Sequence, residues 1–244
     1  MTADNDRPTA RRRRSDRNIR SGRRAKNTAK KRRVSPIIIV LLIASFAYLA
    51  YAIINKNTAQ TKLDNLHTER KAAIKRHEDE LAYYVNLRKN SGVEDIINKY
   101  SAMYQVDSNM VSAVIARESH YDMYAQSKVG ARGFMQIMED TGKWIAGKLN
   151  VEGYTYEHLF DADINIRFGT WYLSYLSDNF GGDPVLVASA YHAGLSNVKL
   201  WVLRNSQDGV SLTPDEIPMD DTKDYVKKVM NAYALYYENY VVNP

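Results

Sequence analysis

The stretch that decides the fold is residues 106–119, which read VDSNMVSAVIARES. Apolar residues recur in it every three to four positions, the period of one face of a helix: Met110, Val111, Val114 and Ile115. Either Asp107 or Ser108 is a suitable N-cap for that helix, because both side chains carry an oxygen that can accept a backbone N–H. The pattern therefore predicts an amphipathic helix that ends near Ser119.

Glu118 is a carboxylate on the apolar face of this helix. It lies three residues after Ile115 and four after Val114, so it continues the apolar stripe. A carboxyl group partly withdrawn from water has a raised pKa and can act as a general acid near neutral pH. The alternative is a helix-end glutamate that points to solvent or pairs with Arg117.

Four further motifs follow in order and decide between these alternatives. After Glu118-Ser119 the chain reads SKVGARGFMQIM at 127–138, NIRFGTWYL at 165–173, AYHAG at 190–194 and TKDYV at 222–226. This series resembles the catalytic core of the lytic transglycosylases that cut bacterial peptidoglycan. The resemblance extends from about Ile96 to Tyr237. It implies a lysozyme-like fold, of the SLT and goose-type lysozyme kind, with a substrate groove.

The resemblance also implies the roles of individual residues. Glu118 is expected to be the single catalytic acid and base, assisted by the substrate's own N-acetyl group. The product would then be a 1,6-anhydro-N-acetylmuramic acid end. Substrate-binding residues are expected among the motif positions, where Gln136 can hydrogen-bond sugar groups and Met135 offers an apolar floor: Ser119, Met135, Gln136, Tyr191, His192 and Tyr225. No cofactor and no metal is expected.

Three positions depart from the family pattern. His192 replaces the usual Asn and adds a titratable group near the site. Phe134 and Glu139 replace the usual Leu and Pro of the second motif. None of these changes removes a catalytic group. The nearby acids Asp122 and Asp140, like Glu139, have no spacing that requires catalysis, so we expect solvated surface positions for them.

The charge of the chain is concentrated at its N-terminus. Residues 1–33 carry 14 Lys and Arg against 3 Asp, a balance of +11, and the remaining residues carry 20 against 25, a balance of −5. The basic run has no interleaved aromatic residues and precedes no recognisable nucleic-acid fold, so nucleic-acid binding is not predicted. The chain has no cysteine, which excludes disulfides, thiolate metal sites and a lipoprotein anchor.

An uncharged segment of 19 residues, 36–54, follows the basic tail. At about 1.5 Å per residue a helix of this length spans the hydrocarbon layer of a bilayer. The positive-inside rule places residues 1–35 in the cytoplasm as a disordered basic tail and everything after Asn55 outside the cell membrane. We predict a retained single-pass anchor, and small residues such as Ala47 and Ala50 leave cleavage as the alternative.

The remaining chain divides into a stalk and a domain. Residues 55–91 are charged and rich in helix formers, with a ragged seven-residue apolar repeat, and predict a helical stalk that Ser91-Gly92 ends. Residues 92–244 show helical periodicity in every apolar window and no strict alternation, so they predict an all-α domain, expected to be the catalytic one.

The sequence therefore predicts a membrane-anchored peptidoglycan lytic transglycosylase. Its expected partners are peptidoglycan glycan strands, the cytoplasmic membrane and proteins of the envelope machinery. Two alternatives stay open. One is a goose-type lysozyme-like hydrolase that uses water as acceptor, and the other is a catalytically idle wall-binding scaffold of a secretion or conjugation apparatus.

Overall fold

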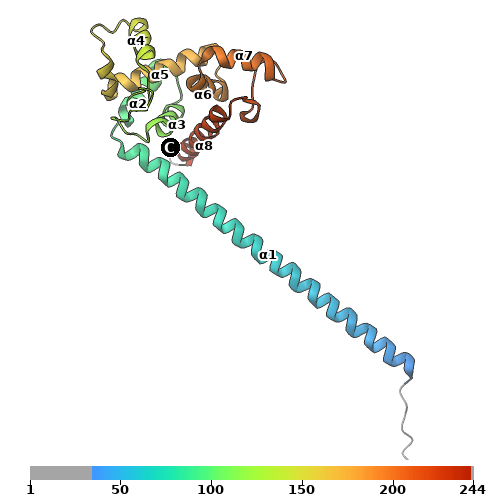
Figure 1. Ribbon diagram of the computed structural model, residues 1–244. Helices are drawn as coiled ribbons and strands as arrows, with labels where there is room; N and C mark the ends of the chain where they lie inside the picture. Colours follow the sequence, from blue (N-terminus) through green and yellow to red (C-terminus); the bar gives the residue numbers. More distant parts are fainter. Residues whose placement is uncertain (1–34, 243–244) are drawn as a thin grey trace, which may run out of the picture. The chain divides into compact units, whose positions relative to one another are not determined.

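A computed structural model describes residues 35–242 of the chain. The predicted cytoplasmic tail, residues 1–35, lies outside the described residues except for Ser35. Within them there is no strand, and only isolated bridges join Arg132 to Gln126 and to Ile137. The predicted all-α class is confirmed. The helices, shown in Figure 1, are α1 (Pro36–Asn90), α2 (Glu94–Tyr104), α3 (Ser108–Ser119), α4 (Glu139–Lys148), η1 (Tyr156–Phe160), α5 (Ala162–Asn179), α6 (Pro184–Ala193), α7 (Leu195–Asn205), η2 (Pro214–Glu216) and α8 (Asp220–Val242).

Two compact units make up the chain, Met1–Leu63 and Asp64–Pro244. The boundary predicted from the sequence was residue 92, where Ser91-Gly92 ends the stalk. Helix α1 does end at Asn90. The compact unit that contains the globular helices begins at Asp64, and α1 contacts those helices from His77 onward.

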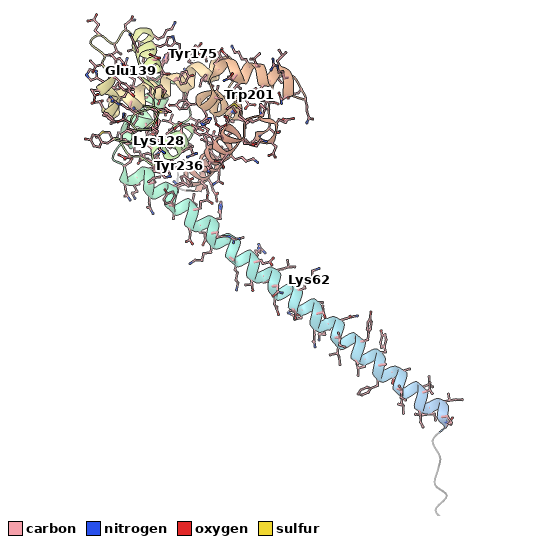
Figure 2. All side chains as sticks on the ribbon, viewed as in Figure 1. Lys62, Lys128, Glu139, Tyr175, Trp201 and Tyr236 are labelled. Carbon is pink, nitrogen blue, oxygen red and sulfur yellow. The ribbon has the colours of Figure 1, made fainter. Side chains whose placement is uncertain are left out.

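In the first unit, residues 36–63 of α1 are exposed on all sides. Phe46 is 76% exposed, and Leu41 and Tyr48 are also largely exposed. Figure 2 shows the side chains of this segment, among them the labelled Lys62, as sticks directed away from the helix. Among the described residues, this is the one helix long and apolar enough to cross a membrane. A large uncovered apolar surface is unfavourable in water and favourable in lipid.

Three helices of the second unit, α3, α5 and α6, begin at an aspartate that caps them. Asp107 accepts from the backbone N–H of Asn109 at the start of α3, which confirms one of the two predicted caps. Asp161 caps α5 in the same way, and Asp183 caps α6 directly before Pro184. Each cap satisfies N–H groups that lack a partner in the first helical turn, and proline at that position has no N–H to leave unsatisfied.

Helix α3 contacts α2, α5 and α8 (Figure 1). Its residues from Val111 to Ala116 are all buried, so the helix is covered on nearly every side. Long apolar side chains of α5 and α8 complete the core around it, among them Ile166, Phe168, Leu173, Val226 and Val229. The close packing of α3 fixes the position of any side chain near its end.

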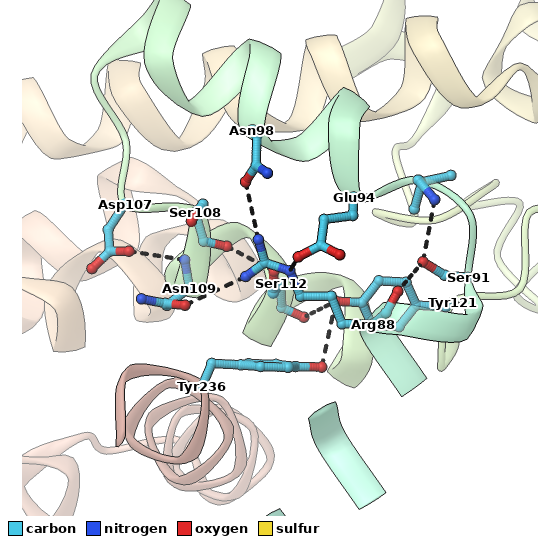
Figure 3. Close-up of polar contacts among 11 residues, drawn as sticks. Arg88, Ser91, Glu94, Asn98, Asp107, Ser108, Asn109, Ser112, Tyr121 and Tyr236 are labelled. Carbon is cyan, nitrogen blue, oxygen red and sulfur yellow. Dashed lines mark hydrogen bonds and ion pairs between the residues drawn. The ribbon is translucent and has the colours of Figure 1, made fainter. Parts of the chain in front are cut away.

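Within the second unit, α1 is joined to the other helices by polar contacts of His77, Glu80 and Arg88. Arg88 donates to Asn98 at 3.0 Å and to Asn109 at 3.4 Å, and its Nε lies 3.3 Å from Glu94 (Figure 3). Further along α1, His77 lies 2.9 Å from Glu238 of α8. The Arg88 contacts join the end of α1 to α2 and to the first turn of α3.

Candidate active site

Glu118 lies in the last turn of α3, as the helical stripe predicted. Its side chain is largely buried, and one carboxylate oxygen accepts a hydrogen bond of 2.7 Å from the phenol of Tyr225 on α8. These two residues are 107 positions apart in the chain. The contact between α3 and α8 therefore creates the pair.

The surroundings of Glu118 raise the pKa of its carboxyl group into the neutral range. Burial raises the pKa of Glu118 to about 7, against the opposing effects of the Tyr225 hydrogen bond and the Arg117 charge, which both lower it. Burial also raises the pKa of Tyr225 well above its usual value, so that phenol stays neutral and can donate. A carboxyl group with a pKa near 7 can give up a proton and take one back at physiological pH.

The second motif forms a tight turn held by Asn165 of α5. The Asn165 side chain accepts from Met135 N at 2.8 Å and donates to the carbonyls of Arg132 (2.9 Å) and Leu159 (2.7 Å). Gly133 has a φ of 73°, and a Cβ there would lie 2.2 Å from the Leu159 carbonyl oxygen. Only glycine therefore fits at Gly133.

Gln136 follows this turn with a φ of 46°, a left-handed conformation that a non-glycine residue adopts at some energetic cost. Its amide nitrogen donates to the carbonyls of Ala125 and Gly133, both at 2.9 Å. These bonds fix the amide group and leave its carbonyl oxygen able to accept from a ligand.

Ser119 and Tyr191 connect the acid's helix and α6 to the second motif. Ser119 is 8% exposed, and its hydroxyl donates to the Phe134 carbonyl at 2.8 Å. The Tyr191 phenol donates to the Met135 carbonyl at 2.7 Å. Both side chains thereby hold the 134–135 backbone in place. A direct contact of either residue with a sugar stays a prediction.

Met135 requires a correction. Its side chain is 0% exposed, and its thioether packs so closely on Gly169 that a Cβ at that glycine would lie 2.1 Å from the sulfur. The expected apolar floor is therefore not formed by this side chain, because no surface of it can be reached. Met135 supports the site from beneath.

His192 lies against Tyr225. The two rings stack with centroids 4.5 Å apart, and His192 Nδ1 is 3.0 Å from the Thr222 hydroxyl. Partial burial lowers the pKa of His192, against the nearby charge of Asp221, which raises it. His192 thus packs against Tyr225, whose phenol donates to Glu118. The other ring nitrogen of His192, Nε2, takes no part in the contact with Thr222.

Other acids and metal-ligand groups do not converge on Glu118 in the part of the chain that the structure describes. Asp122, Glu139 and Asp140 are all exposed, as predicted. Glu139 and Asp140 stand in the first turn of α4, where a negative charge is favourable. Among residues 35–242, no group of three His, Asp or Glu side chains could hold a metal ion.

Sequence reasoning missed three contributors to the site. Arg117, considered only as a partner for Glu118, instead lies 5.6 Å from the centre of the Tyr225 ring. Asn165 and Thr222 were recognised as motif residues without a role. A buried asparagine beside a Gly-rich turn could have been identified as its hydrogen-bond anchor, because such turns leave backbone groups unpaired.

We expect the Tyr225→Phe variant to move the alkaline limb of the activity profile to higher pH. Activity requires the protonated acid, so kcat/KM should fall as pH rises through about 7. The phenol stabilises the charged carboxylate, and its loss raises the pKa of Glu118 further. We also expect about tenfold lower activity at the optimum, since one hydrogen bond to a charged group is lost.

The measurement is kcat/KM against pH for the wild type and for Tyr225→Phe. Tyr237→Phe is the matched control, because Tyr237 is an exposed tyrosine on the same helix. An alkaline limb that stays in place or moves to lower pH in Tyr225→Phe would contradict the role of the phenol.

Glu118 is a largely buried glutamate with a raised pKa, a feature that general acids of glycosidic-bond cleavage share. Comparison with known proteins gives the family. Residues 95–211 match the model of the transglycosylase SLT domain. The chain therefore carries a transglycosylase SLT domain.

Known relatives agree. The soluble lytic murein transglycosylase of Escherichia coli is 33% identical over 151 residues, which are 60% of this chain and 23% of that protein. The membrane-bound lytic murein transglycosylase C of Serratia proteamaculans is 30% identical over 165 residues, 58% of this chain and 45% of that protein. The chain thus spans about a quarter of the length of the soluble relatives it matches.

Solved structures show the same fold. The 70 kDa soluble lytic transglycosylase from Escherichia coli superposes with a TM-score of 0.58 at 30% identity, over 64% of this chain and 26% of that one. An inactive mutant of lytic transglycosylase Slt from Pseudomonas aeruginosa gives a TM-score of 0.57 at 28% identity, over 64% and 25%. The predicted lysozyme-like, SLT-type domain is confirmed.

Proposed function

We propose that this protein is a membrane-anchored peptidoglycan lytic transglycosylase. One observation carries the proposal: Glu118 is largely buried, has a pKa raised to about 7 and is held by Tyr225 within an SLT domain. The relatives named murein transglycosylases support the substrate class.

Glu118 would act twice in one turnover. As an acid it protonates the oxygen of the β-1,4 bond between N-acetylmuramic acid and N-acetylglucosamine, and the bond to the muramic acid C1 breaks. As a base it then takes the proton of the muramic acid's own C6 hydroxyl while that oxygen bonds to C1. The product is a 1,6-anhydro end, and Glu118 is protonated again for the next cleavage.

The neighbouring residues would orient the sugars. The Gln136 carbonyl oxygen and the His192 Nε2 are the polar atoms that their internal hydrogen bonds leave available. Tyr225 would keep the carboxylate in one rotamer. Ser119 and Tyr191 would hold the backbone of the second motif, and we retain both as candidate sugar contacts at the edge of the site.

The product distinguishes the transglycosylase from its alternatives. When the full-length chain in detergent digests purified peptidoglycan, we expect released fragments with predominantly anhydro ends, which are lighter by one water than reducing ends. Among the described residues no second acid is hydrogen-bonded to Glu118 where it could activate water, so the internal hydroxyl is the natural acceptor. Mass spectrometry of the fragments is the measurement.

Each of the other outcomes would indicate a different function for this chain. Predominantly reducing ends would show a lysozyme-like hydrolase that uses the same Glu118 with water. No soluble product across a range of pH, from a protein that is folded, would show the idle scaffold of an envelope apparatus. The Glu118→Gln variant serves as the blank for contaminating activity.

The proposal includes membrane topology. We propose that residues 36–54 span the cytoplasmic membrane, that residues 55–91 continue as the stalk, and that residues 92–244 form the catalytic domain outside. The exposed apolar side chains of residues 36–54 support an anchor. The +11 balance of the preceding residues supports a cytoplasmic N-terminus.

Protease added to intact protoplasts should remove a C-terminal tag and spare an N-terminal one. Cells opened by detergent before the protease is added are the control, since both tags should then be lost. Loss of the N-terminal tag alone from intact protoplasts would contradict both the orientation and a wall substrate.

A further inference from the structure

A pocket lies beside the C-terminal end of α3. Arg117, the residue before Glu118, is one of its lining residues. The volume of the pocket is about 610 Å³. Three elements line it, namely residues 64–90 of α1, the end of α3 and helix α8: Glu80, Tyr84, Ala116, Arg117, His120, Lys227, Lys228 and Asn231. The stalk segment therefore supplies one wall of a pocket adjacent to the catalytic acid.

Arg117 is the unpaired cation of this pocket. No ion pair or hydrogen bond of its guanidinium is present among residues 35–242, and its Nε is buried without a partner. Its guanidinium carbon lies 5.6 Å from the centre of the Tyr225 ring, and its charge also acts on Glu118 and Asp224. A buried N–H without an acceptor is unfavourable, so the arrangement favours a ligand that brings an acceptor.

The other charges around the pocket are already matched. Lys227 pairs with Asp215 and Lys228 with Asp224, both at 2.7 Å, and these four side chains are all more than half exposed. Such exposed pairs are weak and open readily. Glu80 is the one carboxylate in the lining, and it accepts from Asn231 at 2.7 Å.

We propose that this pocket binds a carboxylate of the peptide attached to the glycan strand, with the Arg117 guanidinium as the binding group. The proposal rests on the proposed function, because the peptide of peptidoglycan is attached to the muramic acid whose bond is cut. A guanidinium presents two parallel N–H groups that match a carboxylate. Arg117 directly precedes Glu118, so a peptide bound there stays next to the bond that breaks.

The carboxylate of Glu80 weakens the binding of a peptide carboxylate in this pocket. Its charge opposes a second carboxylate in the same pocket and reduces the attraction that Arg117 provides. The stalk thus takes part in substrate selection, through a residue with no contact to the acid.

The test compares two substrates of the full-length chain in detergent, intact peptidoglycan and glycan strands stripped of peptide by an amidase. The measured quantity is the ratio of kcat/KM on intact to stripped strands. Arg117→Gln should lower this ratio at least about tenfold, the loss of one charged contact. Glu80→Gln should raise it severalfold, because Gln keeps the oxygen that accepts from Asn231 and removes the charge.

The ratio of kcat/KM on the two substrates distinguishes an effect on peptide binding in the pocket from an effect on bond cleavage. Arg117 also contacts Tyr225, and an effect through the acid changes both substrates equally and cancels. Arg204→Gln, an exposed arginine on α7, is the matched control and should leave the ratio unchanged. An unchanged ratio in both Arg117→Gln and Glu80→Gln would overturn the proposal.

A direct binding measurement covers the case in which no strand is cut. The tripeptide L-alanyl-γ-D-glutamyl-L-lysine should bind the wild-type chain in calorimetry, bind Glu80→Gln more tightly and Arg117→Gln at least about tenfold more weakly. Tripeptide binding of this pattern without cleavage of either substrate would refute the proposed function and support the proposed carboxylate-binding pocket. Tripeptide affinity that is equal in the wild type, Arg117→Gln and Glu80→Gln would refute the pocket.

Discussion

The Glu118→Gln variant is expected to cleave peptidoglycan about 10³-fold more slowly than the wild type, because general acid catalysis contributes on this scale and Glu118 is the carboxyl group that Tyr225 holds. Glutamine keeps the size of the side chain and an oxygen for the Tyr225 phenol. It cannot give a proton to the leaving oxygen or take one from the attacking hydroxyl. The measurement is the rate at which soluble fragments appear from a peptidoglycan suspension.

The stability of the same variant provides its control. The pKa of Glu118 is raised to about 7 in the folded state from an ordinary value of 4.5, so ionising the buried carboxyl group costs folding free energy. This penalty is absent below about pH 4.5, grows between the two pKa values and is complete above about pH 7, where it is on the order of 3 kcal/mol. Glu118→Gln should therefore equal the wild type near pH 4 and be the more stable protein at pH 8.

Glu139→Gln is the matched exchange at an exposed acid, and its activity should not change. The assignment of Glu118 is wrong if a folded Glu118→Gln protein clears peptidoglycan at a rate near that of the wild type. A variant that is inactive and also less stable at pH 8 would contradict the burial of the carboxyl group.

The Asn165→Ala variant is expected to lose about 3–5 kcal/mol of folding free energy, with a fall in Tm of roughly 10 °C. Asn165 is 0% exposed and bonds to three backbone groups of the second motif and η1. Alanine leaves the Met135 N–H and the carbonyls of Arg132 and Leu159 buried without that partner. Thermal unfolding followed by circular dichroism is the measurement.

Asn197→Ala is the control for Asn165→Ala. Asn197 is exposed on α7, and its amide makes one bond to the carbonyl of Ala193 at 2.8 Å, so its loss should change the free energy of unfolding by less than about 0.5 kcal/mol. If Asn165→Ala and Asn197→Ala unfold within about 2 °C of each other, Asn165 does not hold the turn. We also expect Asn165→Ala to lower activity, because Gln136 depends on the same turn.

Much of the local structure was predictable from the sequence. The stripe from Met110 to Ile115 and the Asp107 cap gave the helix that carries Glu118, and the uncharged residues 36–54 gave an exposed apolar helix. These features are local, since they depend on residues within a few turns of one another. Glu118 could be identified because a carboxylate on an apolar stripe is costly unless it has a use.

The roles of the supporting residues were less predictable, because they depend on contacts between distant segments. Met135 was expected at the surface and is buried against Gly169 of α5. Ser119 was expected to bind a sugar, and its hydroxyl bonds the carbonyl of Ile115 in the same helix and that of Phe134, 15 residues away. The spacing of motifs indicates that such residues lie in one site, but it does not indicate which of their atoms are in contact.

By itself the sequence determined the helices, the position of the acid on one of them and the apolar segment near the N-terminus, because period, caps and charge act over short distances along the chain. Only the tertiary structure decided the chemistry of the acid. The packing of α3 on α8 buries Glu118 and brings the Tyr225 phenol to it, and burial is what raises its pKa. Residues 64–90 likewise became part of the compact unit only through contacts such as those of Arg88 and Glu80 with helices far along the chain, which no local pattern encodes.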